Sequence, residues 1–234
     1  MTLPHPNVQA LIEVAEGLED LRDEVVFLGG ATVALLLTDP GAHHVRVTKD
    51  VDCIVEVASL LEYHRLDERL RARGFVTDAG GVICRYRLGE RILDVMPTVD
   101  AILGFANRWS RQAILGASPY ELRAGLTARI VAPMHLLATK LEAFKARGRQ
   151  DMLISHDLED IVLLVDGRPE LVEEARSQAP ADLRQYLRET FDDLFADGLF
   201  LEALAGHLPP DDASQARLPV LQARLDALRR LASP

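Results

Sequence analysis

Two aspartates separated by one residue, Asp50 and Asp52, offer the clearest chemistry in the sequence. In an extended strand, side chains two positions apart project from the same face, so both carboxylates would point the same way. Two adjacent carboxylates repel each other unless a cation or a proton lies between them. Mg²⁺ prefers hard oxygen ligands, and triphosphates bring it readily. The pair therefore predicts a magnesium site that carries a nucleoside triphosphate.

A third acid, Asp94, stands alone among apolar residues in segment 91–96 (RILDVM). A lone acid that is buried without a partner costs roughly several kcal/mol, so this one needs a partner. If segments 50–57 and 91–96 are neighbouring strands, the three carboxylates converge. That arrangement suits two-metal phosphoryl transfer, in which one metal holds the triphosphate and the other lowers the pKa of the attacking hydroxyl.

A double glycine, Gly29-Gly30, lies upstream between an apolar run and a helical pattern. Glycines in such a turn let the backbone approach a phosphate, and the helix N-terminus offers free N–H groups and a positive dipole end. Neither the double glycine nor the Asp-x-Asp pair is specific by itself. Their order is much more specific: strand, double glycine, helix, Asp-x-Asp strand, and a later strand with a single Asp.

The elements that must position these residues follow from the hydrophobic pattern. Spacing near 3.6 predicts helices over 7–24, 31–37 and 58–73; alternating or apolar runs predict strands over 25–28, 50–57, 82–88 and 91–96, with a hairpin turn at Gly89-Glu90. A helix over 98–107 and a strand over 128–131 follow. Helices are then expected from Pro133 to about Arg147, and from an N-cap at Ser155 to the end, with breaks near Pro180, Gly198 and Pro209.

Composition places the chain among ordinary globular proteins. Its 234 residues are 48% hydrophobic, and no uninterrupted apolar run reaches the roughly 18 residues of a membrane span. The N-terminal residues lack the basic and apolar blocks of a secretory signal. Cys53 and Cys84 are interpreted as reduced core residues, and His43-His44, with no third ligand nearby, as loop residues. We expect a cytoplasmic protein with no membrane partner.

The charge distribution leaves two interpretations open. A net charge of −10 argues against a protein that grips nucleic acid by bulk electrostatics. Residues 101–149, however, carry eight Arg or Lys against Glu121 and Glu142, a net of +6 between two acidic flanks. Such a segment can mark a surface that meets phosphate. Alternatively, it is a solvated face balanced by neighbouring carboxylates.

In their order, these motifs resemble the nucleotidyltransferase superfamily related to DNA polymerase β. The finer pattern Arg46-x-Thr48-x-Asp50-x-Asp52 resembles the AbiEii-type, or MenT-like, type IV toxin branch. Segment 135–147 (HLLATKLEAFKAR) resembles the third motif of that branch, and segment 155–161 (SHDLEDI) its fourth. The similarity covers roughly residues 25–166. Two departures are that Gly29-Gly30 replaces the usual Gly-Ser, and that His156 stands where a basic residue is expected before Asp157.

From this resemblance we expect an α/β fold, with a nucleotidyltransferase-like mixed sheet flanked by helices and then an all-helical C-terminal half. Residues 1–100 would form the catalytic domain, and residues 101–234 a mainly helical domain that contributes nucleotide- and acceptor-binding residues. The implied activity is Mg²⁺-dependent transfer of a nucleoside monophosphate from an NTP to a hydroxyl acceptor, with release of pyrophosphate. Two metal ions are expected.

Specific roles also follow from the resemblance. The metal ligands would be Asp50, Asp52 and Asp94, which with Lys140 and Asp157 form the catalytic set. The nucleotide-binding set would be Gly29, Gly30, Arg46, Thr48, Lys140 and Arg147. Asp160 would support Arg147 or Lys140.

Each of these roles has a simpler alternative. Lys140 could lie on a solvated helix face, Asp157 could serve only as favourable charge at a helix N-terminus, and Arg46 and Thr48 could merely solvate a loop. Trp109 and Tyr120 could stack a base, but we interpret them as core residues.

The acceptor stays open. The toxin-like branch implies RNA, typically tRNA, and a possible cognate antitoxin; the antibiotic-resistance branches imply a small aminoglycoside or lincosamide. Two further alternatives are a non-catalytic nucleotide-binding relic of the fold and a hydrolase that uses the same metals on phosphate esters.

Overall fold

The chain folds into two compact units. The structure, a computed structural model, describes residues 4–42, 45–78, 80, 83–104 and 106–231, so His43 and His44 lie outside the described residues. The first unit comprises Met1–Leu35 and Arg46–Leu136, and the second comprises Leu36–Val45 and Leu137–Pro234. The chain therefore crosses from one unit to the other three times.

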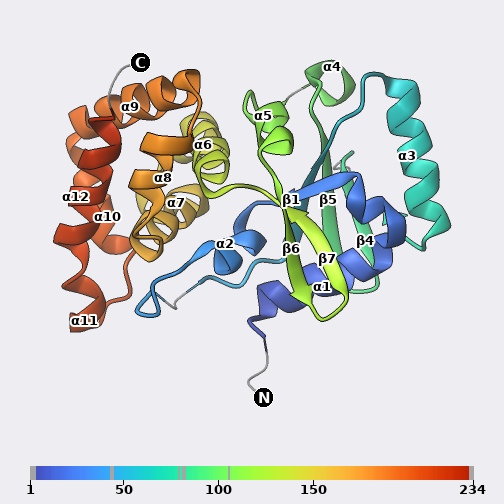
Figure 1. Cartoon of the computed structure of the whole chain (residues 1–234), viewed down its shortest axis with the longest axis horizontal. Helices are drawn as coiled ribbons and strands as arrows, with labels where there is room; N and C mark the ends of the chain where they lie inside the picture. The colour runs from blue at the N-terminus through green and yellow to red at the C-terminus, as the bar shows by residue number, and fades with distance from the viewer. Residues whose placement is uncertain (1–3, 43–44, 79, 81–82, 105, 232–234) are drawn as a thin grey trace. The chain divides into compact units, whose positions relative to one another are not determined.

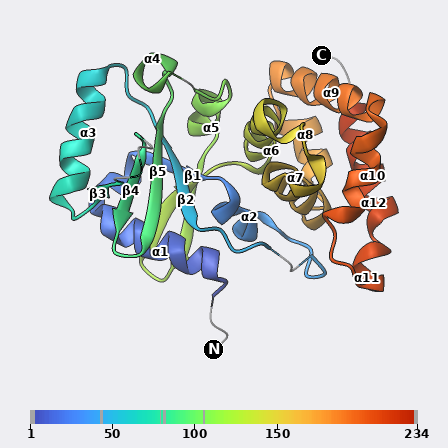
Figure 2. The same cartoon turned by 180° about the vertical axis from the view of Figure 1, so that it is seen from behind.

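One mixed seven-stranded sheet forms the centre of the first unit, in the order β3-β4-β5-β2-β1-β7-β6. Its central β2 and β5 run parallel, as do β1 and β7, whereas the other neighbours run antiparallel. Figure 1 shows the strands, and Figure 2, from behind, shows β3, β4, β5 and β2 in sequence. The strands are β1 (Val25–Leu28), β2 (Asp50–Val55), β3 (Val76–Thr77), β4 (Arg85–Leu88), β5 (Arg91–Pro97), β6 (Ser118–Arg123) and β7 (Leu126–Ile130).

Apolar residues explain why β1 and β2 lie at the centre. All four residues of β1 are buried, and Cys53, Ile54 and Val55 are buried in the second half of β2. Such runs suit strands with neighbours on both sides. The helices of this unit are α1 (Pro6–Leu18), α3 (Leu60–Ala72), α4 (Asp100–Leu103) and α5 (Ser110–Leu115), and α1 contacts β2, β5, β6 and β7. The short α2 (Gly30–Leu36) follows β1 directly.

The described part of the second unit contains helices and no strands. α6 (Pro133–Ala143) enters it from the first unit and continues as one π-helical turn over Phe144–Gly148, followed by a short 3₁₀ turn over Met152–Ile154. Then come α7 (His156–Gly167), α8 (Leu171–Gln178), α9 (Ala181–Ala196), α10 (Gly198–Gly206), α11 (Asp212–Gln215) and α12 (Leu218–Arg229). Their core includes Leu158, Val162, Phe191, Leu221 and Leu225. An α/β fold with a mixed sheet and a helical C-terminal half is thus confirmed.

A loop of the second unit, residues 36–42, is held at the end of α7 by hydrogen bonds and ion pairs. The carbonyl of Gly167 accepts hydrogen bonds from the backbone N–H groups of Thr38 (2.9 Å) and Asp39 (3.0 Å). Arg168 donates to the carbonyl of Leu36 at 2.7 Å. Arg217 joins Asp39 to Asp166 on α7, with both contacts at 2.7 Å. This loop leads from α2 toward the strand that carries Asp50 and Asp52.

The sheet reaches further along the chain than expected. The first unit extends to Leu136, past the boundary expected at residue 100, because β6 and β7 add a hairpin at the sheet edge. β7 (126–130) begins two residues before the expected 128–131 strand, but β6 was not predicted. Five of its six residues are exposed, so it lacks the alternating apolar pattern that marks a half-buried strand.

Two boundaries in the first unit also differ. The helix expected over 7–24 ends at Leu18 and continues as a 3₁₀ helix over Glu19–Asp23, because Glu19 adopts a positive φ of 53°. The strand expected over 82–88 begins at Arg85, and Val82 lies outside the described residues. Among the described residues, no helix combines the length and apolarity that crossing a bilayer requires.

Candidate active site

Strand register brings the three aspartates to one face of the sheet. Asp52 on β2 is the direct parallel partner of Asp94 on β5. Asp50, two residues before Asp52, projects from the same face of β2. The expectation that segments 50–57 and 91–96 are neighbouring strands is confirmed. As a result, three carboxylates gather on two adjacent central strands.

The three carboxylates differ in their exposure to water. The side chain of Asp50 is 36% exposed, Asp52 is half-buried, and Asp94 as a residue is only 8% exposed. Between and beyond the two β2 aspartates, Val51 and Cys53 are buried on the opposite face. β2 therefore turns acids to one side and apolar groups to the other, and the acids lie where solvent can still reach Asp50.

Gly29 makes room for the Asp52 carboxylate. It has a φ of +80°, and a Cβ atom added to it would overlap the carboxylate of Asp52. Leu28, the residue before it, is the last residue of β1 and the antiparallel partner of Asp52 on β2. Thr32 closes the turn by donating to the Gly29 carbonyl from its backbone N–H (3.2 Å) and its hydroxyl (2.9 Å). The first glycine of the pair is therefore required by backbone conformation and by space, while Gly30 begins α2.

Arg85 provides the partner that the buried Asp94 requires. Its Nε and Nη2 atoms donate to the two carboxylate oxygens of Asp94 at 2.8 and 2.7 Å, and Nη2 also donates to Asp50 at 3.1 Å. β4 pairs with β5 so that Arg85 lies directly opposite Asp94. The hydrogen bonds to Asp94 raise the pKa of Arg85, so its charge is permanent. Sequence reasoning predicted that a partner must exist but not which residue it is.

Carboxylate oxygens are the ligands that a hard divalent cation prefers. Three carboxylates lie on one sheet face, and the guanidinium of Arg85 contacts two of them, those of Asp50 and Asp94. Within the described ranges, no three His, Cys, Asp or Glu side chains are grouped tightly enough to hold a metal ion, and Arg85 occupies oxygens of both Asp50 and Asp94. That Asp50, Asp52 and Asp94 hold Mg²⁺ therefore stays a prediction.

Asn7 positions the segment that leads into Asp50. This buried residue of α1 donates from its side-chain amide to the carbonyl of Arg46 at 2.9 Å and accepts from the N–H of Thr48 at 3.0 Å. The Thr48 hydroxyl donates to the carbonyl of Asp50 at 3.1 Å. Arg46 and Thr48 thus belong to a fixed approach to β2, and their phosphate binding stays a prediction. Sequence reasoning missed Asn7 because an amide in a first helical turn ordinarily signals no more than a cap.

A second charged cluster lies in the second unit. Lys140 on α6 contacts Asp157 at 3.2 Å and Asp160 at 2.6 Å, and both aspartates are buried on α7. Arg147, with a 72% exposed side chain, makes a bidentate contact with Asp157 at 2.8 and 3.1 Å. The structure thus brings together Lys140, Arg147, Asp157 and Asp160. Of the two partners expected for Asp160, Arg147 or Lys140, the structure shows a contact with Lys140.

Local backbone structure places this cluster. Arg147 lies on the π-helical turn after α6, and such turns are frequent at functional sites. A Cβ atom on Gly148 would overlap the Ser155 hydroxyl, which caps α7 by accepting from the N–H of Leu158 at 3.3 Å. The predicted Ser155 cap is confirmed. Burial raises the pKa of Asp157, but hydrogen bonds from Arg147 and the charge of Lys140 outweigh it, so the pKa lies below its ordinary value.

Most of the basic segment 101–149 is balanced by carboxylates. Five of its eight cations form ion pairs with acids outside the segment. The pairs are Arg111 with Glu56, Arg123 with Glu16, Lys140 with Asp157 and Asp160, Arg147 with Asp157, and Arg149 with Asp193. The interpretation of a face balanced by neighbouring carboxylates therefore holds for these five. Trp109 is buried, as interpreted, whereas Tyr120 is 39% exposed on β6, so its interpretation as core was wrong.

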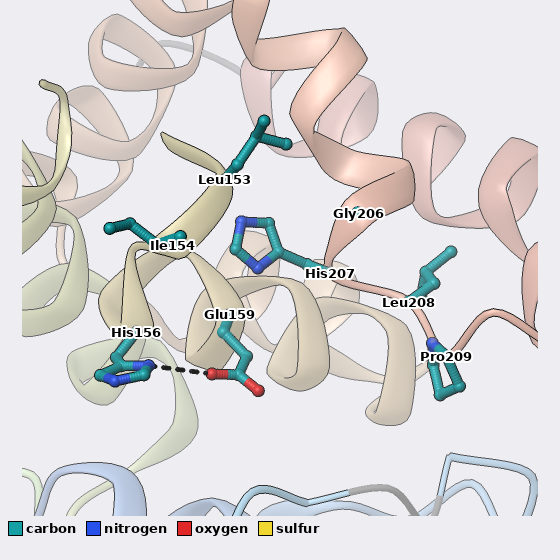
Figure 3. Close-up of a pocket in the computed structure, with 8 residues that line it drawn as sticks. All are labelled: Leu153, Ile154, His156, Glu159, Gly206, His207, Leu208 and Pro209. Atoms are coloured by element: carbon teal, nitrogen blue, oxygen red, sulfur yellow. Dashed lines mark hydrogen bonds and ion pairs between the residues drawn. The ribbon is translucent and has the colours of Figure 1, made fainter. Parts of the chain in front are cut away.

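The described part of the chain has two surface pockets whose linings do not include the three carboxylates. The pocket in the second unit, of about 410 Å³, is lined by Leu153, Ile154, His156, Glu159 and residues 206–209, and Figure 3 shows His156 and Glu159, which lie 3.3 Å apart. The pocket in the first unit, of about 430 Å³, is lined by residues of 24–69 that include Glu56 and Arg65. Neither lining includes Asp50, Asp52 or Asp94.

No protein-family model matches the chain, and no curated protein matches it. Similar solved structures include the antibiotic-resistance factor ANT(2'')-Ia, at 13% identity over 81% of this chain and 92% of that one, with a TM-score of 0.48. A candidate nucleotidyltransferase from H. pylori is similar at 12% identity over 97% and 96%, with a TM-score of 0.47. JHP933 from Helicobacter pylori is similar at 12% identity over 98% and 94%, with a TM-score of 0.44. Because identities of 12–13% and TM-scores of 0.44–0.48 carry no argument about function, the function has to be inferred from the side chains.

Proposed function

We propose that this chain is a divalent-metal-dependent nucleotidyltransferase, which moves a nucleoside monophosphate from an NTP to a hydroxyl group. The observation that carries the proposal is the gathering of Asp50, Asp52 and Asp94 on one face of two adjacent strands. Gly29 supports it, because the absence of a side chain there leaves the Asp52 carboxylate in place beside the turn. A purely structural role would not require three acids in the centre of a sheet.

In the proposed reaction, one bond to the α-phosphorus forms and another breaks. The acceptor oxygen forms a bond to the α-phosphorus, the bond from that phosphorus to the bridging oxygen of the β-phosphate breaks, and pyrophosphate leaves with the electron pair. The hydroxyl proton passes to a base. When bound, the metal would neutralise triphosphate charge and lower the pKa of the hydroxyl. Asp50, Asp52 and Asp94 would hold it, and Arg85 orients Asp94 through its two-point contact.

For the acceptor we propose RNA, with tRNA the first candidate, and a toxin-like role with a cognate antitoxin. The support is the four motifs in order, from Gly29-Gly30 to segment 155–161. The basic segment adds little, because five of its eight cations are already paired. A small antibiotic acceptor is the alternative. The nucleotide contacts of Lys140, Arg147, Gly30 and the Arg46–Thr48 segment stay predictions, as does the catalytic role of Asp157.

The test is incubation with each α-labelled NTP and Mg²⁺, with and without total tRNA or a panel of aminoglycosides and lincosamides. We expect label on RNA and release of pyrophosphate, with Asp52→Asn reducing transfer by at least about 100-fold. Asp78→Asn is the matched control, because its ion pair, with Arg87 at 2.9 Å, does not involve the three carboxylates. It should retain transfer.

The other outcomes separate the alternatives. Label on a drug and none on RNA would replace the acceptor but keep the reaction. Release of inorganic phosphate from phosphate esters, without pyrophosphate, would indicate a hydrolase. NTP binding without turnover under any condition would indicate a non-catalytic relic and overturn the proposal.

A further inference from the structure

The guanidinium of Arg85 lies among the carboxylates that the proposed function assigns to a metal. It contacts both oxygens of Asp94, at 2.8 and 2.7 Å, and Oδ2 of Asp50 at 3.1 Å. The side chains of Arg85 and Asp94 are only 25% and 12% exposed. Water therefore screens this pair less than a pair on the open surface, and the charges act on each other more strongly.

Charge compensation makes this contact consequential. Asp50, Asp52 and Asp94 contribute three negative charges on neighbouring positions, and Arg85 offsets one of them. A divalent cation at the same carboxylates would offset two, but it would repel the nearby guanidinium. The two cations also seek the same oxygen atoms. Binding of one must therefore weaken binding of the other.

The backbone keeps Arg85 in place as a competitor. Leu88 and Arg91 pair across the turn of the β4–β5 hairpin, and the register then sets Arg85 opposite Asp94. A tethered cation has a high effective concentration at its partner, whatever the concentration of free metal. Its planar fork also matches a carboxylate in two contacts, which a free lysine-like charge would not do.

We infer that Arg85 is a built-in counter-cation that competes with the divalent metal for Asp50 and Asp94. The contacts with Arg85 keep Asp50 and Asp94 ordered without metal, and metal binding requires the guanidinium to release Asp50 and at least part of its hold on Asp94. The free chain then binds metal weakly by itself and gains it together with the triphosphate. The inference rests on the proposed function, since it assumes that these three carboxylates bind the metal.

The decisive measurement is Mn²⁺ binding to the free full-length chain, by calorimetry and by electron paramagnetic resonance, without nucleotide. We expect Arg85→Gln to bind Mn²⁺ about tenfold or more tightly than the unchanged chain, the loss of one charge-assisted contact being enough for that factor. Arg87→Gln is the matched control. Arg87 lies on the same strand and pairs with Asp78 at 2.9 Å, so its loss removes a β4 ion pair without touching the three carboxylates.

Thermal unfolding with and without Mn²⁺ gives a second measurement. In the presence of a chelator, Arg85→Gln should unfold at a lower temperature than the unchanged chain, because three acids lose their counter-charge. Mn²⁺ should raise its Tm more than it raises that of the unchanged chain. Arg85→Lys keeps the charge but loses the two-point contact; it should fall between the two and serves if Arg85→Gln does not fold.

The outcomes distinguish this inference from the proposed function. Equal or weaker Mn²⁺ binding by folded Arg85→Gln and Arg85→Lys would overturn competition and leave Arg85 as a positioning residue, while metal-dependent transfer could still be found. No Mn²⁺ binding by any of these proteins would overturn both the inference and the metal site. Tighter binding by Arg85→Gln that Asp52→Asn abolishes, without transfer from any NTP, would support the competition and overturn the activity.

Discussion

At the scale of single residues, the carboxylate face depends on a residue that has no side chain. Gly29 sits with a positive φ at the end of β1, and Asp52 fills the space where its Cβ would be. A phosphate-binding role for such a glycine is the usual expectation. In this chain Gly29 decides where the carboxylate of Asp52, an acid of the proposed metal site, can lie.

Replacement of Gly29 by alanine tests this role. Gly125→Ala is the matched control, since Gly125 has nearly the same φ (+77° against +80°) and no described atom within 4 Å of an added Cβ. The φ strain alone should cost each variant about 1–2 kcal/mol of unfolding free energy in urea. Gly29→Ala should lose more than Gly125→Ala and should also bind Mn²⁺ less tightly. Equal losses and equal Mn²⁺ binding would show that Asp52 adjusts freely.

A second prediction concerns Asp157 and pH. Hydrogen bonds from Arg147 and the charge of Lys140 outweigh burial and lower the pKa of Asp157. The folded chain then holds this proton less tightly than the unfolded chain, so protonation favours unfolding. The stabilising contribution is complete above the ordinary aspartate pKa of about 4 and is lost as the pH falls through the lower folded value.

Urea unfolding at several pH values between about 6 and about 3 measures this contribution. Asp157→Asn should be less stable than the unchanged chain near neutral pH, because Lys140 and Arg147 lose a buried partner. Its stability should also fall less steeply toward acid. An identical acid dependence in both proteins would contradict the assigned cause.

At the scale of elements, strand register could have identified the partner of the buried Asp94 from the sequence. A turn at Gly89-Glu90 pairs Leu88 with Arg91, and counting outward from there places Arg85 opposite Asp94. Arg85 could therefore have been predicted as the partner of Asp94. It was missed because Arg85 and Arg87 alternate with Tyr86 and Leu88, a pattern typical of a strand with one face in water.

Other elements could not be predicted from local patterns. The strands β1, β2 and β5 carry continuous or alternating apolar residues and were predicted, with β2 and β5 as neighbours stated as a condition; their parallel direction was not predicted. β6 has only Leu122 buried, so nothing in its sequence separates it from a loop. β3 has two exposed residues and exists only through its pairing with β4. Edge strands of this kind depend on tertiary contacts.

The hydrogen bonds from α1 to the approach of β2 give a third prediction. Asn7→Ala removes both contacts of a buried amide with the backbone of Arg46 and Thr48, which should cost about 1–3 kcal/mol. Nucleotidyl transfer should also fall, since Asp50 follows directly. Gln9→Ala is the control on the same helix, because the Gln9 amide contacts only Glu13 within α1 among the contacts described at that side chain. Unchanged transfer with a normal unfolding free energy would rule out a positioning role for Asn7.

At the scale of the whole molecule, charge limits how RNA could bind. The chain carries a net charge of −10, and most cations of its basic segment are paired with carboxylates. A cation that is already paired with a carboxylate contributes less to displacing counterions from a phosphate backbone. An RNA acceptor would have to be recognised by a small number of contacts.

This reasoning gives a fourth prediction. In the absence of NTP, binding of tRNA should be weak, and the logarithm of its affinity should fall with the logarithm of salt concentration with a slope of about −3 or shallower. Fluorescence anisotropy over a salt series measures the slope. A slope of about −6 or steeper would show a broad basic surface and contradict the balanced charge.

The loop over residues 36–42 has a consequence for how the gene can be divided. Because Gly167, Arg168 and Arg217 hold that loop, the second unit includes a stretch that is encoded between α2 and β2 of the first. A stop codon after Leu136 would remove those anchors and leave the loop exposed just ahead of Asp50. The two halves of this gene therefore cannot be separated, exchanged or inherited independently by a single cut, and recombination between relatives would have to preserve both ends of the loop together.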